Sequence, residues 1–332
     1  NLSKHKAFTF IHILGLAIGT AACLLILQYV QFERSYDTFH QNAENIYRVP
    51  IEYSKGFGAF PKTATNHPGL GPAMLADFPE VENYTRIFDP NNMGFNLALS
   101  YTNANGEKVH TTEEEVFAAD STFFDIFSFP FISGNPNTVL DEPNTVVLSE
   151  STVKKYYGAA DPIGKVITLF GREIKVTGVI ADIPENSHLQ FDALLSFKSL
   201  LRNIGVKDSW IWPEFYTYVT LSKEANPKEL AAKFPAFTER YLGEVHKEHG
   251  FQTYFSLQSL LDIHLKTDCA NEPTPPGDVR VVSFLSLLAL FILIIAWVNY
   301  INLSTSKSME RAMEVGVRKV VGARRSQLMG QF

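Results

Sequence analysis

The sequence has 332 residues, a formal net charge of −6 and two cysteines, Cys23 and Cys269. A chain of this length can bury a stable core without disulfide bonds, and it has no basic, aromatic-studded patch of the kind that binds nucleic acid. Composition therefore excludes a small disulfide-stapled domain and argues against a nucleic-acid partner.

Two uncharged stretches, residues 8–30 and 281–303, dominate the sequence. Each has 23 residues, and as a helix each would reach roughly 35 Å, enough to cross a hydrocarbon layer of about 30 Å. Buried core helices are usually shorter and keep a polar face, so we predict two transmembrane helices. A cleaved signal peptide is the alternative for the first stretch, but its apolar run continues beyond Cys23 and is longer than a signal core.

Charge predicts the orientation of these helices. The two ends of the chain carry 8 basic and 2 acidic residues, whereas residues 33–280 carry 21 basic and 33 acidic residues. Basic flanks stay in the cytoplasm, so residues 1–7 and 304–332 are predicted inside and residues 31–280 outside. Cys23 would then lie in the membrane and Cys269 outside it, where they cannot pair.

The outer segment begins with a predicted polar helix over residues 32–44, which would extend the first span outward. A β-α-β unit follows. Alternating apolar residues predict strands over residues 46–53 and 81–88, and a proline near its first turn opens a short helix over residues 73–78.

A second unit of the same kind appears later, with an aromatic-rich strand over residues 214–221, a helix over residues 227–241 and a strand over residues 251–260. Two such units around an insertion of short strands and turns predict one α+β extracytoplasmic domain. Its predicted parts are a split β-α-β subdomain at residues 45–91 and 206–265 and an inserted β-rich subdomain at residues 92–205.

Three features inside this domain carry local predictions. The aromatic group at residues 123–131 is predicted to be core, and Ser149 is predicted to cap a helix over residues 150–157. Residues 271–277 contain three prolines and predict a hinge-like linker before the second span.

The sequence holds no constellation that supports catalysis. Residues 158–165 loosely resemble a phosphate-binding loop, but the glycine spacing is wrong and Val166 stands where Ser or Thr would hold magnesium. Asp262 and His264 could share a strand face near Cys269, yet a third spaced metal ligand is missing. His12 lies in the first span and is read as an interfacial residue or a helix contact. We predict no catalytic, cofactor-binding or metal-binding residue.

The segment after the second span is basic and amphipathic. Met309, Met313, Val317, Val320 and Val321 recur at spacings of three and four, and charged residues occupy other positions. Such a helix can lie in the lipid headgroup layer or dock into a groove on a cytosolic partner, and the residues alone leave both open.

Residues 302–306, NLSTS, and 311–324, RAMEVGVRKVVGAR, resemble the coupling segment of MacB/FtsX-like ABC transporter permeases. The family pattern is roughly R-A-x-E-[IV]-G-[IV]-R-[KR]-[AV]-x-G-A. Weaker matches lie at residues 68–80, 145–150 and 158–164. The resemblance covers the chain in order as an N-terminal fragment, with a MacB-type periplasmic core domain and the start of the FtsX-like permease domain.

The resemblance implies a non-catalytic permease subunit, multi-pass in the bacterial cytoplasmic (inner) membrane, whose split subdomain is porter-like. ATP and magnesium would be bound by a separate cytosolic P-loop ATPase, and hydrolysis would move the outer domain (mechanotransmission) to export or extract a drug, peptide or lipoprotein. Further implied partners are a second permease half or copy, membrane lipid and a periplasmic or outer-membrane adaptor. The implied ATPase contacts are Met309, Arg311, Met313, Glu314, Val317, Arg318, Lys319 and Val321.

Other functions remain as alternatives. The main one is a two-span membrane sensor with an extracytoplasmic ligand-binding domain, which should continue into a long heptad helix. Gly316 and Gly322 interrupt such a pattern. A membrane-tethered enzyme would need a catalytic cluster, and an adhesion protein has no specific support.

Overall fold

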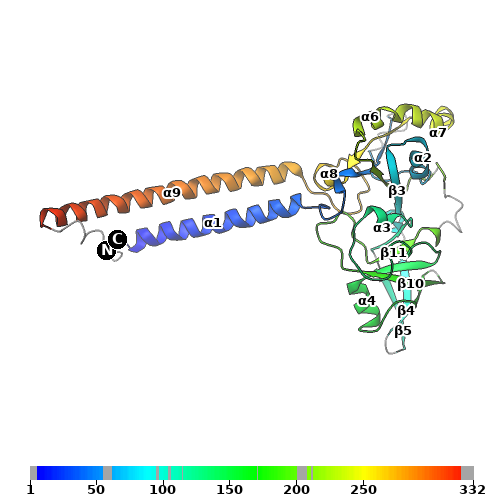
Figure 1. Ribbon diagram of the computed structural model, residues 1–332, viewed down its shortest axis with the longest axis horizontal. Helices are drawn as coiled ribbons and strands as arrows, with labels where there is room; N and C mark the ends of the chain where they lie inside the picture. The colour runs from blue at the N-terminus through cyan, green and yellow to red at the C-terminus, as the bar shows by residue number, and fades with distance from the viewer. Residues whose placement is uncertain are drawn as a thin grey trace. The chain divides into compact units, whose positions relative to one another are not determined.

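The computed structural model describes residues 6–54, 62–94, 97–103, 106–113, 115–169, 171–199, 208–210 and 212–322. The chain divides into two compact units. One contains Asn1–Arg34 with Asp278–Phe332, and the other contains Ser35–Gly277. Figure 1 shows the elements of both units.

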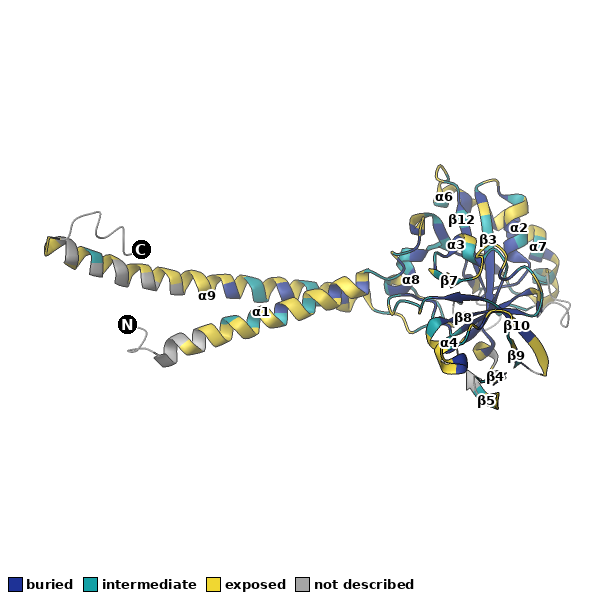
Figure 2. Cartoon of the chain, turned by 60° about the horizontal axis from the view of Figure 1, so that its bottom comes forward, coloured by how far each residue is buried: buried dark blue, intermediate teal, exposed yellow. Residues whose placement is uncertain are grey.

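The first unit is a pair of long helices, α1 (Lys6–Arg34) and α9 (Val279–Val320). Both are long and apolar enough to cross a membrane, over Ile13–Arg34 and Val279–Asn302. They pack on each other, and the Cys23 thiol lies 3.5 Å from the carbonyl oxygen of Ala289. Elsewhere most of their surface is exposed (Figure 2), as expected of helices that face lipid. The side chain of His12 lies outside the described side chains.

The second unit is a mixed α+β domain. Its elements in chain order are η1 (Ala43–Asn45), β1 (Ile46–Arg48), β2 (Ile51–Tyr53), α2 (Leu70–Asp77), β3 (Val81–Phe88), η2 (Pro90–Met93), β4 (Leu97–Thr102), β5 (Lys108–Glu113), β6 (Val116–Ala119), α3 (Phe123–Ile126), β7 (Phe131–Ser133), β8 (Thr145–Ser149), α4 (Glu150–Tyr157), β9 (Val166–Leu169), β10 (Arg172–Ile180), β11 (Ala193–Ser196), β12 (Phe215–Leu221), α6 (Pro227–Ala232), α7 (Phe234–His249), β13 (Thr253–Phe255), β14 (Gln258–Ser259) and α8 (Leu260–Lys266).

One 12-stranded sheet runs through this unit in the order β14-β1-β12-β3-β6-β11-β8-β10-β9-β4-β5, with β7 paired to β10. Strands β1 and β3 come from the first β-α-β unit, and both pair with β12 from the second. The sheet therefore pairs strands that lie far apart in the sequence, and the predicted α+β fold class is confirmed.

The insertion joins the same sheet through a short seam. Ile87 and Phe88 of β3 pair with Ala119 and Ala118 of β6. The guanidinium of Arg86 on β3 reinforces the seam, since its Nε and Nη2 donate to the carboxylate of Asp120 at 2.8 and 2.9 Å. The insertion and the split subdomain thus share one hydrogen-bonded sheet.

The aromatic group of the insertion is core, as predicted. Phe123, Phe127 and Phe129 are buried and contact one another, and Phe191 packs against two of them. Burial of such rings is a main source of stability for the insertion. The Oγ of Ser149 accepts a hydrogen bond from the backbone N–H of Thr152, which confirms the predicted cap of α4.

The predicted helix over residues 32–44 is wrong. Helix α1 ends at Arg34, and the chain continues in turns to η1. Asp37 and Asn42 adopt left-handed conformations, with φ of 58° and 59°. A residue with a left-handed backbone conformation cannot continue a right-handed helix. The backbone N–H of Asp37 donates instead to the carbonyl of Asn186 at 2.9 Å, so a tertiary contact overrides the local helical spacing.

The predicted continuous strand over residues 251–260 is wrong, because the structure has two short strands there, β13 and β14, and helix α8 from Leu260. Asp262 and His264 therefore share no strand face. Asp262 forms an exposed ion pair with Lys266 at 2.7 Å, whereas His264 is buried. Among the described residues, no three His, Cys, Asp or Glu side chains come together as a metal site.

Candidate functional site

Two segments of the second unit continue along the chain into the long helices. We call residues 35–42 the incoming segment, because they follow α1, and residues 267–277 the outgoing segment, because they precede α9. These two segments are the covalent connections between the domain and the long helices. We call the two segments and the side chains that hold them the tether site.

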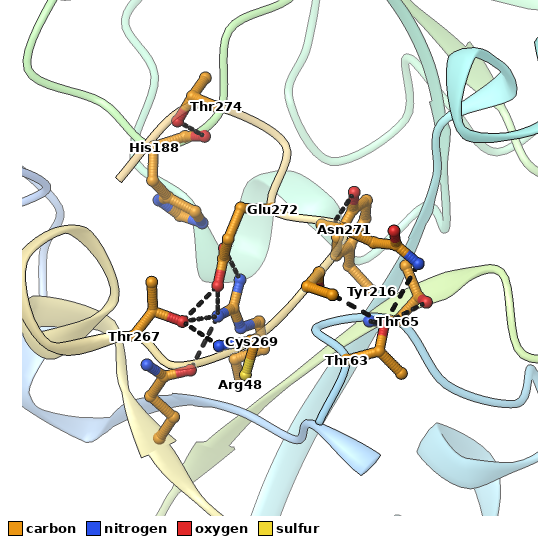
Figure 3. A network of polar contacts seen from close by, with 12 residues as sticks. Arg48, Thr63, Thr65, His188, Tyr216, Thr267, Cys269, Asn271, Glu272 and Thr274 are labelled. Atoms are coloured by element: carbon orange, nitrogen blue, oxygen red, sulfur yellow. Dashed lines mark hydrogen bonds and ion pairs between the residues drawn. The ribbon is translucent and has the colours of Figure 1, made fainter. Parts of the chain in front are cut away.

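A buried ion pair holds the outgoing segment. Arg48 lies on β1 and is fully buried, and its Nη1 and Nη2 donate to the two carboxylate oxygens of Glu272 at 2.5 and 2.6 Å. Figure 3 shows this pair, with the Thr267 hydroxyl donating to the same carboxylate. Burial alone would lower the pKa of Arg48, but the hydrogen bonds and charge of Glu272 outweigh it and raise the pKa.

Hydrogen bonds hold the outgoing segment at several points, and the hinge-like linker over residues 271–277 stays a prediction. Asn271 has a left-handed φ of 56°. Further hydrogen bonds join the Ala270 N–H to the Lys62 carbonyl at 2.7 Å, the Tyr216 hydroxyl to the Asn271 carbonyl at 2.8 Å, the Thr274 hydroxyl to the His188 carbonyl at 3.0 Å, and the Gly277 N–H to the His264 carbonyl at 2.9 Å.

A buried carboxylate holds the incoming segment. Asp37 is fully buried, and its Oδ1 lies 2.9 Å from Nδ1 of His188 and 3.7 Å from Nε2 of His40. The same oxygen accepts the backbone N–H of His188 at 3.2 Å. Burial would raise the pKa of Asp37, but the neighbouring imidazoles hold this pKa well below its usual range. The carboxylate is thus a firm acceptor at neutral pH.

Two histidines tie the segments to each other. The His188 ring contacts Asp37, while its backbone carbonyl accepts the hydroxyl of Thr274. The His264 ring stacks on Tyr36 with centroids 3.3 Å apart, while its backbone carbonyl accepts the N–H of Gly277. Each histidine therefore contacts the incoming segment with its ring and the outgoing segment with its backbone.

A further buried histidine predicts a pH dependence of stability. Burial lowers the pKa of His67 from 6.5 to about 4, and its Nδ1 has no hydrogen-bond partner among the described residues. The pKa of His67 is lower in the folded chain than in the unfolded chain. The folded state therefore has its full stability above pH 6.5, where His67 is neutral in both states, and it loses free energy of unfolding as the pH falls toward 4. We expect a loss of about 2 kcal/mol in the free energy of unfolding between pH 7.5 and pH 5.

The measurement is urea unfolding of the purified chain at both pH values, followed by tryptophan fluorescence. The variant His67→Gln serves as the control, because it retains the other buried histidines, including His40, whose pKa burial also lowers. The variant should lose about 2 kcal/mol less than the parent over this pH range. An equal loss in both chains would refute the assignment to His67.

The residues predicted to contact an ATPase lie on the C-terminal part of α9 and in the turn after it. The side chains of Met309, Met313, Val317 and Val321 are 60–82% exposed. They follow one another every four residues, so they form a stripe that drifts slowly around the helix. We call this the apolar stripe. The side chains of Arg311, Glu314, Arg318 and Lys319 lie outside the described side chains.

Sequence reasoning missed the tether site. Arg48 gave one signal, a charged residue inside an apolar strand pattern. Asp37, His188 and Glu272 gave none, because isolated polar residues in turns are usually solvated. Their partners lie 224 residues apart for Arg48 and Glu272 and 151 residues apart for Asp37 and His188, so no local pattern could pair them.

Comparison with known proteins gives consistent matches. A sequence model of the MacB-like periplasmic core domain matches residues 9–237. The macrolide export ATP-binding/permease protein MacB of Vibrio parahaemolyticus is 20% identical over 334 residues, and that of Acinetobacter baylyi is 22% identical over 347 residues. The matches cover 100% of this chain and 47% of each relative, so the chain spans about half their length.

A solved structure shares the fold. It is the crystal structure of a domain assigned to a permease protein from Porphyromonas gingivalis, with a TM-score of 0.56 and 22% sequence identity. The match covers 74% of this chain and 98% of that domain. Such a likeness supports the fold of the α+β unit.

Proposed function

Since the chain belongs to the family of MacB-like periplasmic core domains, we propose that it is a permease subunit whose outer domain is moved by ATP hydrolysis in a separate cytosolic ATPase. The relatives of this chain belong to the same permease family, and their names include ATP binding as well as export. Within this sequence, the one stretch that resembles a phosphate-binding loop, at residues 158–165, has the wrong spacing. The proposal of a partner that binds ATP and magnesium rests on the resemblance of residues 311–324 to the coupling segment of MacB/FtsX-like permeases.

The observation that carries the proposal is the length of α9. It runs from Val279 to Val320 as one helix of 42 residues, roughly 63 Å long. Its candidate membrane span ends at Asn302, so the helix extends well beyond it to the apolar stripe. Energetic coupling between two sites needs an element that both can bias, and an unbroken helix is such an element.

The same continuity favours a protein partner over the headgroup layer. A helix that lies in the membrane plane must bend sharply away from the span that precedes it, and sharp bends need Pro, a π-bulge or a similar break. Within the described residues, α9 is helical without interruption through Gly316. The apolar stripe therefore supports docking into a groove of the ATPase.

The cargo and the other partners follow from the family relationship. We propose export or extraction of a drug, peptide or lipoprotein, because the named relatives are macrolide exporters. We also propose a second permease copy or half, surrounding lipid, and a periplasmic or outer-membrane adaptor as partners. The chain is proposed to sit in the bacterial inner membrane, with the α+β domain outside.

The docking role of the apolar stripe predicts a loss of partner binding. The side chain of Met313 is 74% exposed at the centre of the stripe, and Met313→Glu would carry a charge into an apolar groove. We expect binding of the cognate ATPase to weaken at least about tenfold. The measurement is capture of the purified ATPase by the detergent-solubilised chain over a range of concentrations.

The matched control is Ser308→Glu. Ser308 is exposed, lies outside the two stretches that resemble the coupling segment, and is five residues before Met313, which turns it away from the stripe. It receives the same new charge and should leave ATPase binding within about twofold of the parent. Equal binding by Met313→Glu and the parent chain would contradict docking through the stripe.

A further inference from the structure

The tether site holds both the incoming segment and the outgoing segment through buried charged groups of the domain. Glu272 is held by Arg48 of β1, and Asp37 is held by His188. The backbone carbonyl of His188 also accepts the hydroxyl of Thr274, two residues after Glu272, so His188 contacts both segments; Figure 3 shows the bond to Thr274. His188 is therefore a contact through which a displacement of the outgoing segment can reach the incoming segment.

We infer that the Arg48–Glu272 pair is a positioning element of transport, which makes the outer domain follow α9 instead of slipping against it. This inference rests on the proposed function and names the residues that would transmit the motion of α9 to the outer domain. Glu272 is the last charged residue of the outgoing segment before α9. Its carboxylate is bonded to Arg48 of strand β1 and so to the sheet. Two short charge-assisted bonds in a buried site resist displacement far better than a solvated pair would.

A second buried pair in the same domain offers a matched control. Arg86 and Asp120 form a bidentate contact like that of Arg48 and Glu272, and Arg86 is 2% exposed. This pair joins β3 to the insertion and touches neither the incoming nor the outgoing segment in the contacts described. The variants Glu272→Gln and Asp120→Asn each remove one charge from a buried arginine pair, so both lose stability for the same reason.

The test follows the outer domain by energy transfer in proteoliposomes that contain the chain, its cognate ATPase and acceptor-labelled lipid. The donor is attached to Tyr254→Cys, at an exposed position of β13, in a background of Cys23→Ala and Cys269→Ala. The parent and Asp120→Asn should change transfer efficiency on ATP addition. With Glu272→Gln, the cognate ATPase should still hydrolyse ATP, but the ATP-dependent change in transfer efficiency should be at least about fivefold smaller than in the parent, which matches the lower range of coupling energies.

Thr274→Val provides a second variant that keeps the buried charges and removes only the bond to His188. Thr274→Val should reduce the ATP-dependent change in transfer efficiency by a smaller factor than Glu272→Gln. If Glu272→Gln does not fold, the result for Thr274→Val tests the inference. A normal change in every folded variant of the outgoing segment would overturn the inference. Absence of any change in the parent would overturn the proposed function and the inference with it, so the two failures are distinguishable.

Discussion

The variant Glu314→Lys is expected to abolish ATP-driven transport while leaving the chain folded and inserted. Glu314 lies on α9 between Met313 and Val317 of the apolar stripe, and the resemblance to the family coupling segment assigns it to the ATPase contact. Reversing a charge in a desolvated interface removes a pair and creates a repulsion, which costs about 2–5 kcal/mol of binding free energy. Such a loss would separate ATP hydrolysis from the permease.

The measurement combines ATPase capture with transport in reconstituted vesicles, and trypsin protection reports insertion. Glu310→Lys is the matched control, because it makes the same charge change one helical turn earlier at a residue with no assigned contact. The control should retain most of its transport. If the Glu314→Lys chain pumps as well as the parent, the family role assigned to this residue does not apply here.

The variant Arg48→Met is expected to lower the free energy of unfolding by about 3–5 kcal/mol. The substitution leaves the carboxylate of Glu272, whose side chain is 7% exposed, without its charge partner in a buried site. Removing one member of a buried ion pair is far more costly than removing both. The double variant Arg48→Met with Glu272→Leu should therefore recover most of the loss.

Denaturant unfolding followed through Trp210 and Trp212, both in the α+β domain, would measure these differences. Lys247→Met is a useful control, because Lys247 and Glu239 form an ion pair with side chains 77% and 63% exposed. It should cost less than about 1 kcal/mol. A double variant no more stable than Arg48→Met alone would show that the buried charge of Glu272 is not the source of the loss.

The parts of the fold that the sequence predicted are those set by local pattern. The two long apolar helices follow from uncharged runs, and strands β3 and β12 follow from alternation and aromatic content. Ser149 was predicted as a cap because its hydroxyl serves a backbone N–H only three residues away. Each of these features depends on neighbours in sequence.

A distant partner accounts for the wrong helix after α1. Phe32, Tyr36 and Phe39 have helical spacing, but Asp37 between them is drawn into a left-handed turn by His188. The prolines of the outgoing segment gave no sign that Glu272 bonds to Arg48, which lies 224 residues away in the sequence. No single-sequence pattern reports such a pairing, so the tether site emerges only from the three-dimensional arrangement.

The sheet also bears on how this architecture can be altered. Phe88, the last residue of β3, is the direct antiparallel partner of Phe215, the first residue of β12. The chain thus departs for the insertion and returns from it at one point of the sheet. A tight loop between these two residues could replace the whole excursion without rethreading a strand, provided that the exposed edge of β3 is shielded. The excursion contains Asn186 and His188, so its replacement would keep the chain connections to α1 and α9 but would remove the contacts that hold the incoming segment.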